Sequence, residues 1–353
     1  MYEYNKWHTL FALQVQQISC RKNGMKRIVS ILCLCIVGVV LTGGCIRKDR
    51  DVKVLKLAHG LDTGHPVHKA MVFMADRAKE KSGGRLRIDI YPSEQLGSEK
   101  ECIEQLQIGA LSMTKISSSA LESFIPKAKV LGLPYLFRDS EHYWKVLLGP
   151  IGKELLAAGE DKPVYLKGLC FYDAGARSFY TKNKRIDSPA DLKGLKIRVQ
   201  RSEMAIRMIQ AMGASATPID WGELYTSLQQ GVVDGAENNS PSFYTSMHYE
   251  VCKYYILDEH TRPPDVLLIS AIVWNKLSPQ FQQILQEAAD ESVEYERKLW
   301  AEQEKANLEA VEKAGVTILR PDKEPFRQAV QSMWKEFEGT EVGKLAERIL
   351  EVQ

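Results

Sequence analysis

Hydrophobic and polar positions alternate from residue 54 onward in a way that predicts a regular succession of strands and helices. Helical spacing of apolar residues begins at Pro66, and again after a capping serine at Ser98. These helices separate three predicted strands, VLKLAHG (54–60), LRIDIYP (86–92) and LSMTKIS (111–117). The resulting βαβαβ order predicts a parallel sheet in a first α/β lobe.

A second α/β set follows a predicted helical stretch at residues 141–159. PVYLKGLCFYD (163–173) is long enough to cross between two lobes, and VLLISAIVW (266–274) carries no charge, which predicts a fully buried strand that returns to the first lobe. Between them lie the predicted elements FYTKN, GLKIRVQ, EMAIRMIQAMG, SATPID, WGELYTSLQQG and VVDGAENN.

One long helix is predicted from Pro279 to about Gly315, because this stretch contains no internal proline or glycine. It would span roughly 55 Å, more than the width of either lobe, so we expect it to lie across both. A coiled-coil dimer arm is the alternative, but no heptad is sustained and we expect a monomer. The predicted parts are lobe I (51–173 with 263–300), lobe II (174–262 with 301–325) and a C-terminal helical segment (326–353).

The N-terminal region predicts export. Lys26 and Arg27 precede an apolar run that ends in LTGGC, and residues 25–44 therefore predict a signal peptide. LTGGC resembles a bacterial lipobox, although Thr42 stands where leucine is usual, so we expect Cys45 to carry a lipid that holds the protein on the outer face of the cytoplasmic membrane. Plain cleavage and an uncleaved anchor are the alternatives. Residues 1–24 do not fit this pattern, and we expect translation to begin at Met25.

Composition adds few functional signals. The 353 residues have a formal net charge of +2, with basic and acidic residues interspersed, so no nucleic-acid partner is expected. Three cysteines follow the predicted cleavage point without metal-binding spacing, and we expect buried thiols at Cys102, Cys170 and Cys252.

The sequence motifs of common enzymes and metal sites are absent: there is no GxGxxG, GxxxxGK[ST], GxSxG or HExxH. His59, His65 and His68 lie within ten residues, but no nearby carboxylate completes a ligand set. We therefore expect no metal, no cofactor and no enzymatic activity.

Polar side chains that suit an organic acid fall near the ends of predicted strands, where α/β sheets place their ligands. Each alone is explained by solvent, capping or a turn, but together they converge on one predicted edge. A guanidinium group binds a carboxylate in a bidentate fork, and a tryptophan covers an apolar ring face. The candidate residues are His59, Glu99, Ser117, Arg177, Arg198, Trp221, Asn238 and His260.

At these residues the segment from GARSFYTKN to VVDGAENN (175–239) resembles the signature region of TRAP (tripartite ATP-independent periplasmic) transporter substrate-binding proteins. The resemblance covers about residues 53–345. It rests on ADLKGLKIRV, on the spaced E-Y-LQ-G-VDGAEN pattern, and on IDIYPSEQLGSEKECIEQLQIGALSM and LGLPYLF. It implies a two-lobed, periplasmic-binding-protein-like α/β fold, with crossing strands and a long helix, that closes around an organic acid.

The resemblance also implies roles for individual residues. Arg198 of the GLK-x-R motif would form the main salt bridge to the substrate carboxylate, Arg177 of G-x-R would assist, and Asn238 of D-G-x-E-N would add a hydrogen bond. Trp221 falls where the family often places an aromatic residue against the ligand. Glu99, Ser117 and His59 fall near positions that vary with the substrate.

The segments GARSFY, KIRVQ, DGAENN and DEH most resemble the corresponding segments of family members that bind hexuronates such as galacturonate and glucuronate. A polar sugar would give Glu99, His59 and His260 hydroxyl partners. A sialic-acid-like ligand and a C4-dicarboxylate remain alternatives, and a diacid would need a second cation, for which Lys115 is the candidate. The expected function is delivery of the acid to a membrane permease of two integral subunits. Presentation of the ligand to a membrane receptor is the alternative.

Overall fold

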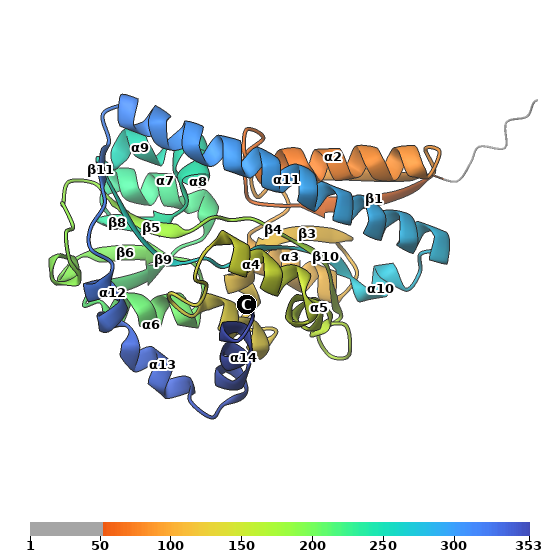
Figure 1. Ribbon diagram of the computed structural model, residues 1–353. Helices are drawn as coiled ribbons and strands as arrows, with labels where there is room; N and C mark the ends of the chain where they lie inside the picture. Colours follow the sequence, from red (N-terminus) through yellow and green to blue (C-terminus); the bar gives the residue numbers. More distant parts are fainter. Residues whose placement is uncertain (1–51) are drawn as a thin grey trace, which may run out of the picture. The chain divides into compact units, whose positions relative to one another are not determined.

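The computed structural model describes residues 52–353, which form two β-sheets with helices around them (Figure 1). The predicted start at Met25, the signal peptide at residues 25–44 and the lipidation of Cys45 lie outside the described residues. Between residues 52 and 353, every helix is too short or too polar to span a bilayer.

The first sheet has the strand order β2-β1-β3-β10-β4. β1 pairs in parallel with β2 and with β3, which confirms the predicted βαβαβ arrangement. β10 lies antiparallel between β3 and β4. The connecting helices begin where the sequence predicts, with a His65 cap before α2 (Pro66–Lys81) and a Ser98–Glu101 capping box at α3 (Glu99–Gln107). The strands are β1 (Lys53–Ala58), β2 (Leu86–Tyr91), β3 (Met113–Ser117), β10 (Asp265–Ser270) and β4 (Leu166–Tyr172).

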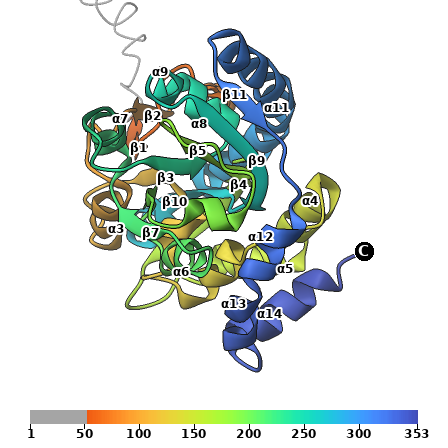
Figure 2. The ribbon, with the colours of Figure 1, turned by 90° about the vertical axis from the view of Figure 1, so that its left-hand side faces the viewer.

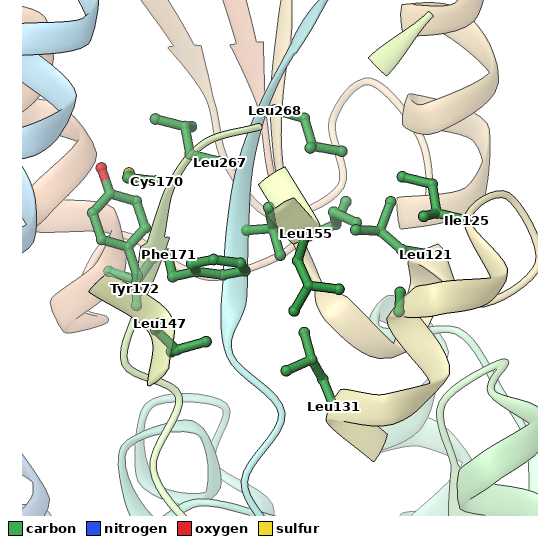
Figure 3. Close-up of a cluster of buried hydrophobic side chains, with 14 of the residues drawn as sticks. Leu121, Ile125, Leu131, Leu147, Leu155, Cys170, Phe171, Tyr172, Leu267 and Leu268 are labelled. Carbon is green, nitrogen blue, oxygen red and sulfur yellow. The ribbon is translucent and has the colours of Figure 1, made fainter. Parts of the chain in front are cut away.

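One face of this sheet buries a cluster of apolar side chains. Figure 3 shows Phe171 of β4 and Leu268 of β10 near Leu155 of α5 (Pro150–Ala157). Leu121 and Ile125 lie to the right of Leu155 in this view. All five are buried. Burying each such side chain stabilises the fold by about 1.5–3 kcal/mol, so the two antiparallel strands are held firmly against the helices.

The second sheet has the strand order β11-β9-β5-β8-β6-β7. β6 is parallel to β7 and β8, whereas β5 is antiparallel to β8 and β9. Its helices include α6 (Glu203–Ala211), α7 (Trp221–Gln230), α8 (Ser240–Thr245) and α9 (His248–Val251). The strands are β5 (Arg177–Thr181), β6 (Lys196–Val199), β7 (Ser215–Pro218), β8 (Gly235–Asn238), β9 (Tyr254–Thr261) and β11 (Thr317–Leu319).

The long helix α11 (Pro279–Lys313) joins the two halves, as predicted. It packs along α2 and β4 of the first half and against α8 of the second (Figure 1). Figures 1 and 2 show the C-terminal helices α13 (Gln331–Phe337) and α14 (Glu341–Leu350) well away from α11, below the sheets. The two-lobed α/β architecture is therefore the one that the motifs imply.

Two local predictions are wrong. The strand predicted through residue 274 stops at Ser270, whose hydroxyl accepts a hydrogen bond from Val273 N–H and caps the short helix α10 (Ala271–Trp274). The single helix predicted over 141–159 is divided into α4 (Ser140–Leu148) and α5, because Gly149 ends the first and a proline without an N–H begins the second.

Gly235 is predicted to be irreplaceable in the D-G-A-E-N segment. A Cβ atom there would lie 2.3 Å from the Tyr180 carbonyl oxygen of the neighbouring strand β5. We expect Gly235→Ala to lower the free energy of unfolding by about 1–3 kcal/mol, measured by urea denaturation. Gly64→Ala is the matched control, because its Cβ would meet only the Asp62 side chain, at 3.1 Å. Equal stability of the two variants would contradict the prediction.

Candidate functional site

A cavity lies between the two sheets, at an edge where strands of both come together. Its volume is about 90 Å³. β3, β6 and β8 end at this edge, while the antiparallel strands β5 and β10 begin there with Arg177 and Asp265. The structure brings a large part of the predicted site to its walls, namely Glu99, Ser117, Arg177, Arg198, Trp221 and Asn238.

Arg198 is the central cation of the cavity wall. The residue is 2% exposed, and its Nε–H donates to the Ile219 carbonyl oxygen at 2.8 Å. Its buried Nη1 has no hydrogen-bond partner among residues 52–353. Burial lowers the pKa of Arg198, since the charged form is desolvated. A buried guanidinium with an unsatisfied N–H is energetically unfavourable unless an anion reaches it.

Trp221 stands beside this guanidinium. It is the first residue of α7, and the Arg198 guanidinium carbon lies 5.6 Å from the centroid of its ring. The centroid of the Trp221 ring also lies 5.1 Å from that of the His248 ring. The cation–π contact stabilises the buried charge and keeps the indole at the cavity wall.

Arg177 directs four of its five N–H groups to protein partners. Its Nε–H and Nη2–H groups donate to the Glu237 carboxylate, a further Nη2–H donates to the Glu237 carbonyl oxygen, and Nη1–H donates to Asn238 Oδ1 at 2.8 Å. Asn238 Oδ1 also accepts from the Asn239 backbone N–H, at 2.9 Å. The Asn238 amide nitrogen takes part in neither of these two bonds. The bonds to Oδ1 orient the Asn238 side chain in the wall of the cavity that it lines.

His260 lies behind this pair rather than in the cavity wall. It is fully buried, its Nδ1 lies 2.7 Å from Asp258 Oδ2, and its Nε2 lies 3.5 Å from Glu237 Oε2. Burial alone would lower the pKa of His260, but Asp258 and then Glu237 raise it to about 9. Burial opposes ionisation of Glu237 too, yet Arg177 and His260 lower its pKa to about 2. His260 therefore contacts the residues that orient Arg177, not the cavity.

His59 is also held away from the cavity. Its Nδ1 accepts from the Leu61 backbone N–H at 3.1 Å, so its Nε2 carries the proton and donates to His68 Nδ1 at 3.0 Å. Burial, with Lys115 and His68 adding to it, lowers the pKa of His59 to about 2. Both ring nitrogens thus have protein partners. In residues 52–353, no group of three His, Cys, Asp or Glu side chains could hold a metal ion.

The first sheet contributes a compact group of charges. Lys115 Nζ lies 3.0 Å from Asp265 Oδ2 and 4.0 Å from Glu99 Oε1. Glu99 Oε1 also accepts from the Ser117 backbone N–H at 2.8 Å. Burial raises the pKa of Glu99 to about 7, against the opposing effect of Lys115. All four residues line the cavity.

Hydrogen bonds connect the two halves around the cavity. Ser117 Oγ donates to Gln200 Oε1 at 3.3 Å, and the Gly222 backbone N–H donates to Glu94 Oε2 at 3.0 Å. His65, which caps α2, lies with its Nε2 3.2 Å from Ser242 Oγ of α8. At least one residue of each pair lines the cavity, so these bonds link the two halves at its border.

Several cavity residues were not predicted from the sequence. Asp265 directly precedes a predicted strand, at its start rather than its end, and only the antiparallel direction of β10 brings it to this edge. Gln200 follows Arg198 by two residues on the same face of GLKIRVQ, and this alternation was a usable signal. Glu94 also lines the cavity.

The model of bacterial extracellular solute-binding protein family 7 (DctP) matches residues 57–340 of this chain. The Salmonella typhimurium protein YiiZ is 40% identical over 282 residues, which are 80% of this chain and 86% of YiiZ.

Two solved structures of TRAP periplasmic solute-binding proteins are similar in fold and sequence. One, from Bradyrhizobium and in complex with α/β-D-galacturonate, is 45% identical with a TM-score of 0.82 and covers 84% of this chain and 99% of its own. The other, from Pseudomonas putida and with bound D-glucuronate, is 38% identical with a TM-score of 0.82 and covers 85% of this chain and 98% of its own.

The raised pKa of His260 predicts how the stability of the protein depends on pH. Because its folded pKa of about 9 exceeds its unfolded value of 6.5, His260 contributes stability that is complete below pH 6.5 and lost as the pH rises through 9. We expect His260→Gln to remove roughly 1–3 kcal/mol of stability near pH 6 and much less above pH 9. Urea denaturation across this range measures the difference. Parallel stability curves for the two proteins would contradict the prediction.

Proposed function

This chain belongs to family 7 of the bacterial extracellular solute-binding proteins and is a TRAP transporter substrate-binding protein, and from this premise we propose that it binds a hexuronate through Arg198. The family binds solutes and has a transport role rather than an enzymatic one. The ligand carboxylate would accept hydrogen bonds from the Arg198 guanidinium, and the chain would deliver the acid to the membrane permease of its transporter.

The observation that carries this proposal is the unpartnered Nη1 of Arg198. It is a buried donor on a positive group, in the wall of a cavity, and no residue between 52 and 353 satisfies it. A carboxylate supplies both the acceptor and the compensating charge. Arg177 would act mainly by orienting Asn238, because most of its N–H groups already bind Glu237 and Asn238.

Two observations favour a hexuronate over other acids. Relatives at 38% and 45% identity were solved with glucuronate and galacturonate, respectively. Within this chain, Trp221 offers an aromatic face beside Arg198, while Glu99, Lys115 and Ser117 offer polar atoms to a hydroxylated ring. The hexuronate would thus touch both sheets, and contacts to both would favour the closed arrangement of the two lobes.

The first test is Arg198→Ala, measured by isothermal titration calorimetry with D-galacturonate and D-glucuronate. We expect micromolar or tighter binding by the wild type to at least one of them, and a loss of about 30- to 5000-fold in the variant. The loss follows from removing the one cavity-lining cation that has no carboxylate partner among residues 52–353.

Arg207→Ala is the matched control, because Arg207 is an arginine on α6 that pairs with Glu203 and Glu336 outside the cavity. It should bind as the wild type does. Near-normal affinity of Arg198→Ala would refute the site assignment. Failure of the wild type to bind any hexuronate, with tight binding of succinate or sialic acid instead, would refute the ligand.

We also propose that the chain is cleaved before Cys45 and lipidated there, as the LTGGC motif suggests. Expressed in a bacterial host with radiolabelled palmitate, the wild type should carry the label and sediment with membranes. Cys45→Ser should lose the label. A soluble, unlabelled wild-type protein would show plain cleavage instead, and a native peptide from residues 2–24 would refute initiation at Met25.

A further inference from the structure

We propose that Lys115, Asp265 and Glu99, which together offer no net positive charge, form a subsite for the hydroxyl groups of the ligand, which admits monocarboxylates and rejects dicarboxylates. This inference rests on the proposed binding of an organic acid in the same cavity. It concerns the end of the ligand that does not carry the Arg198-bound carboxylate.

The subsite is built by the first sheet, whereas Arg198 belongs to the second. Lys115 lies on β3 and Asp265 at the start of β10, two antiparallel neighbours in which Asp265 stands opposite Ser117. Glu99 begins α3 and is fixed by the Ser117 backbone N–H. Lys115 and Asp265 are 3% and 6% exposed, so their positions are set by packing and not by solvent. A ligand held at Arg198 would meet these residues from the opposite wall.

The charges of the cavity leave room for a single anionic group. Five cations line it, and among the described residues each of them except Arg198 has a carboxylate partner. Lys115 pairs with Asp265, Arg177 with Glu237, Arg201 with Asp220 and Lys100 with Glu104. A second ligand carboxylate would therefore reach the first sheet without a free cation to receive it.

The hydrogen-bonding groups of the subsite suit hydroxyls. Lys115 has three N–H donors and directs one of them to Asp265, at 3.0 Å. Glu99 uses Oε1 to accept from Ser117, which leaves its second oxygen outside that bond. A hydroxyl group both donates and accepts, so adjacent hydroxyls match a lysine between two carboxyl groups. A carboxylate only accepts, and it would face the like charges of Asp265 and Glu99.

The predicted specificity switch is Asp265→Asn, which removes the charge that neutralises Lys115 with little change in size. Calorimetry would compare the more tightly bound of galacturonate and glucuronate with the dicarboxylate formed by its oxidation at C1, galactarate or glucarate. We expect the wild type to prefer the hexuronate by at least about tenfold, and Asp265→Asn to reduce this preference by at least about tenfold.

Asp187→Asn is the matched control, because it removes the same charge from an aspartate that pairs with Arg185 outside the cavity. It should leave the preference nearly unchanged. The double variant Lys115→Gln/Asp265→Asn should restore rejection of the diacid, since the gain requires the freed ammonium group. Circular dichroism would show whether Asp265→Asn folds. If it does not, Glu99→Gln is the second single variant, and it should also reduce the preference for the hexuronate over the diacid.

The outcomes separate the two proposals. If the wild type binds a hexuronate but neither Asp265→Asn nor Glu99→Gln shifts the preference, the subsite is refuted and the hexuronate assignment stands. A wild type that binds the diacid as tightly as the hexuronate also refutes the subsite. If the wild type binds no hexuronate at all, the proposed function fails first.

Discussion

The buried guanidinium of Arg198 is the group on which the architecture of the cavity depends. An ionised side chain inside a protein needs compensation, and here the protein supplies it only in part, through the Ile219 carbonyl oxygen and the face of Trp221. The neighbouring cations instead each have a carboxylate partner, as Arg177 has Glu237 and Lys115 has Asp265. Among the described residues that line the cavity, Arg198 is thus the one cation without a carboxylate partner.

Keeping such a charge buried demands a rigid surround, and the fold provides it from two directions. Strand β6 is hydrogen-bonded on both sides, by β7 and by β8, so the backbone of Arg198 cannot shift independently. Behind it, Asp258 and His260 hold Glu237, which holds Arg177 and thereby Asn238. Helix α11 contacts elements of both halves and limits how they move relative to each other.

Much of this arrangement was predictable from local patterns. The parallel β1, β2 and β3 followed from the βαβαβ order, and the long helix from the lack of glycine and proline after Pro279. The errors arose where one local rule competed with another. The apolar run after Asp265 predicted a strand to residue 274, but the Ser270 cap turned its last four residues into a helix. A Gly149–Pro150 pair ended one helix and began another within a single apolar pattern.

The sequence by itself determined a large part of the residues near the cavity edge, among them Arg198 and Asn238, because strand periodicity and the GLKIRV and DGAEN motifs are local properties of the chain. It could not determine which of those side chains face the cavity. His59 and His260 both fall at predicted strand ends, but their ring nitrogens contact other protein groups. Asp258 is a local partner of His260, two residues away, whereas His68 of His59 and Glu237 of His260 come within reach only in the packed molecule. Asp265 reaches Lys115, 150 positions earlier in the chain, for the same reason: strand direction and pairing are decided by the sheet as a whole. Tertiary structure thus decided which cations of residues 52–353 are paired in the cavity wall and that Arg198 is not, because pairing such as that of Lys115 with Asp265 depends on distances between side chains that are remote in sequence.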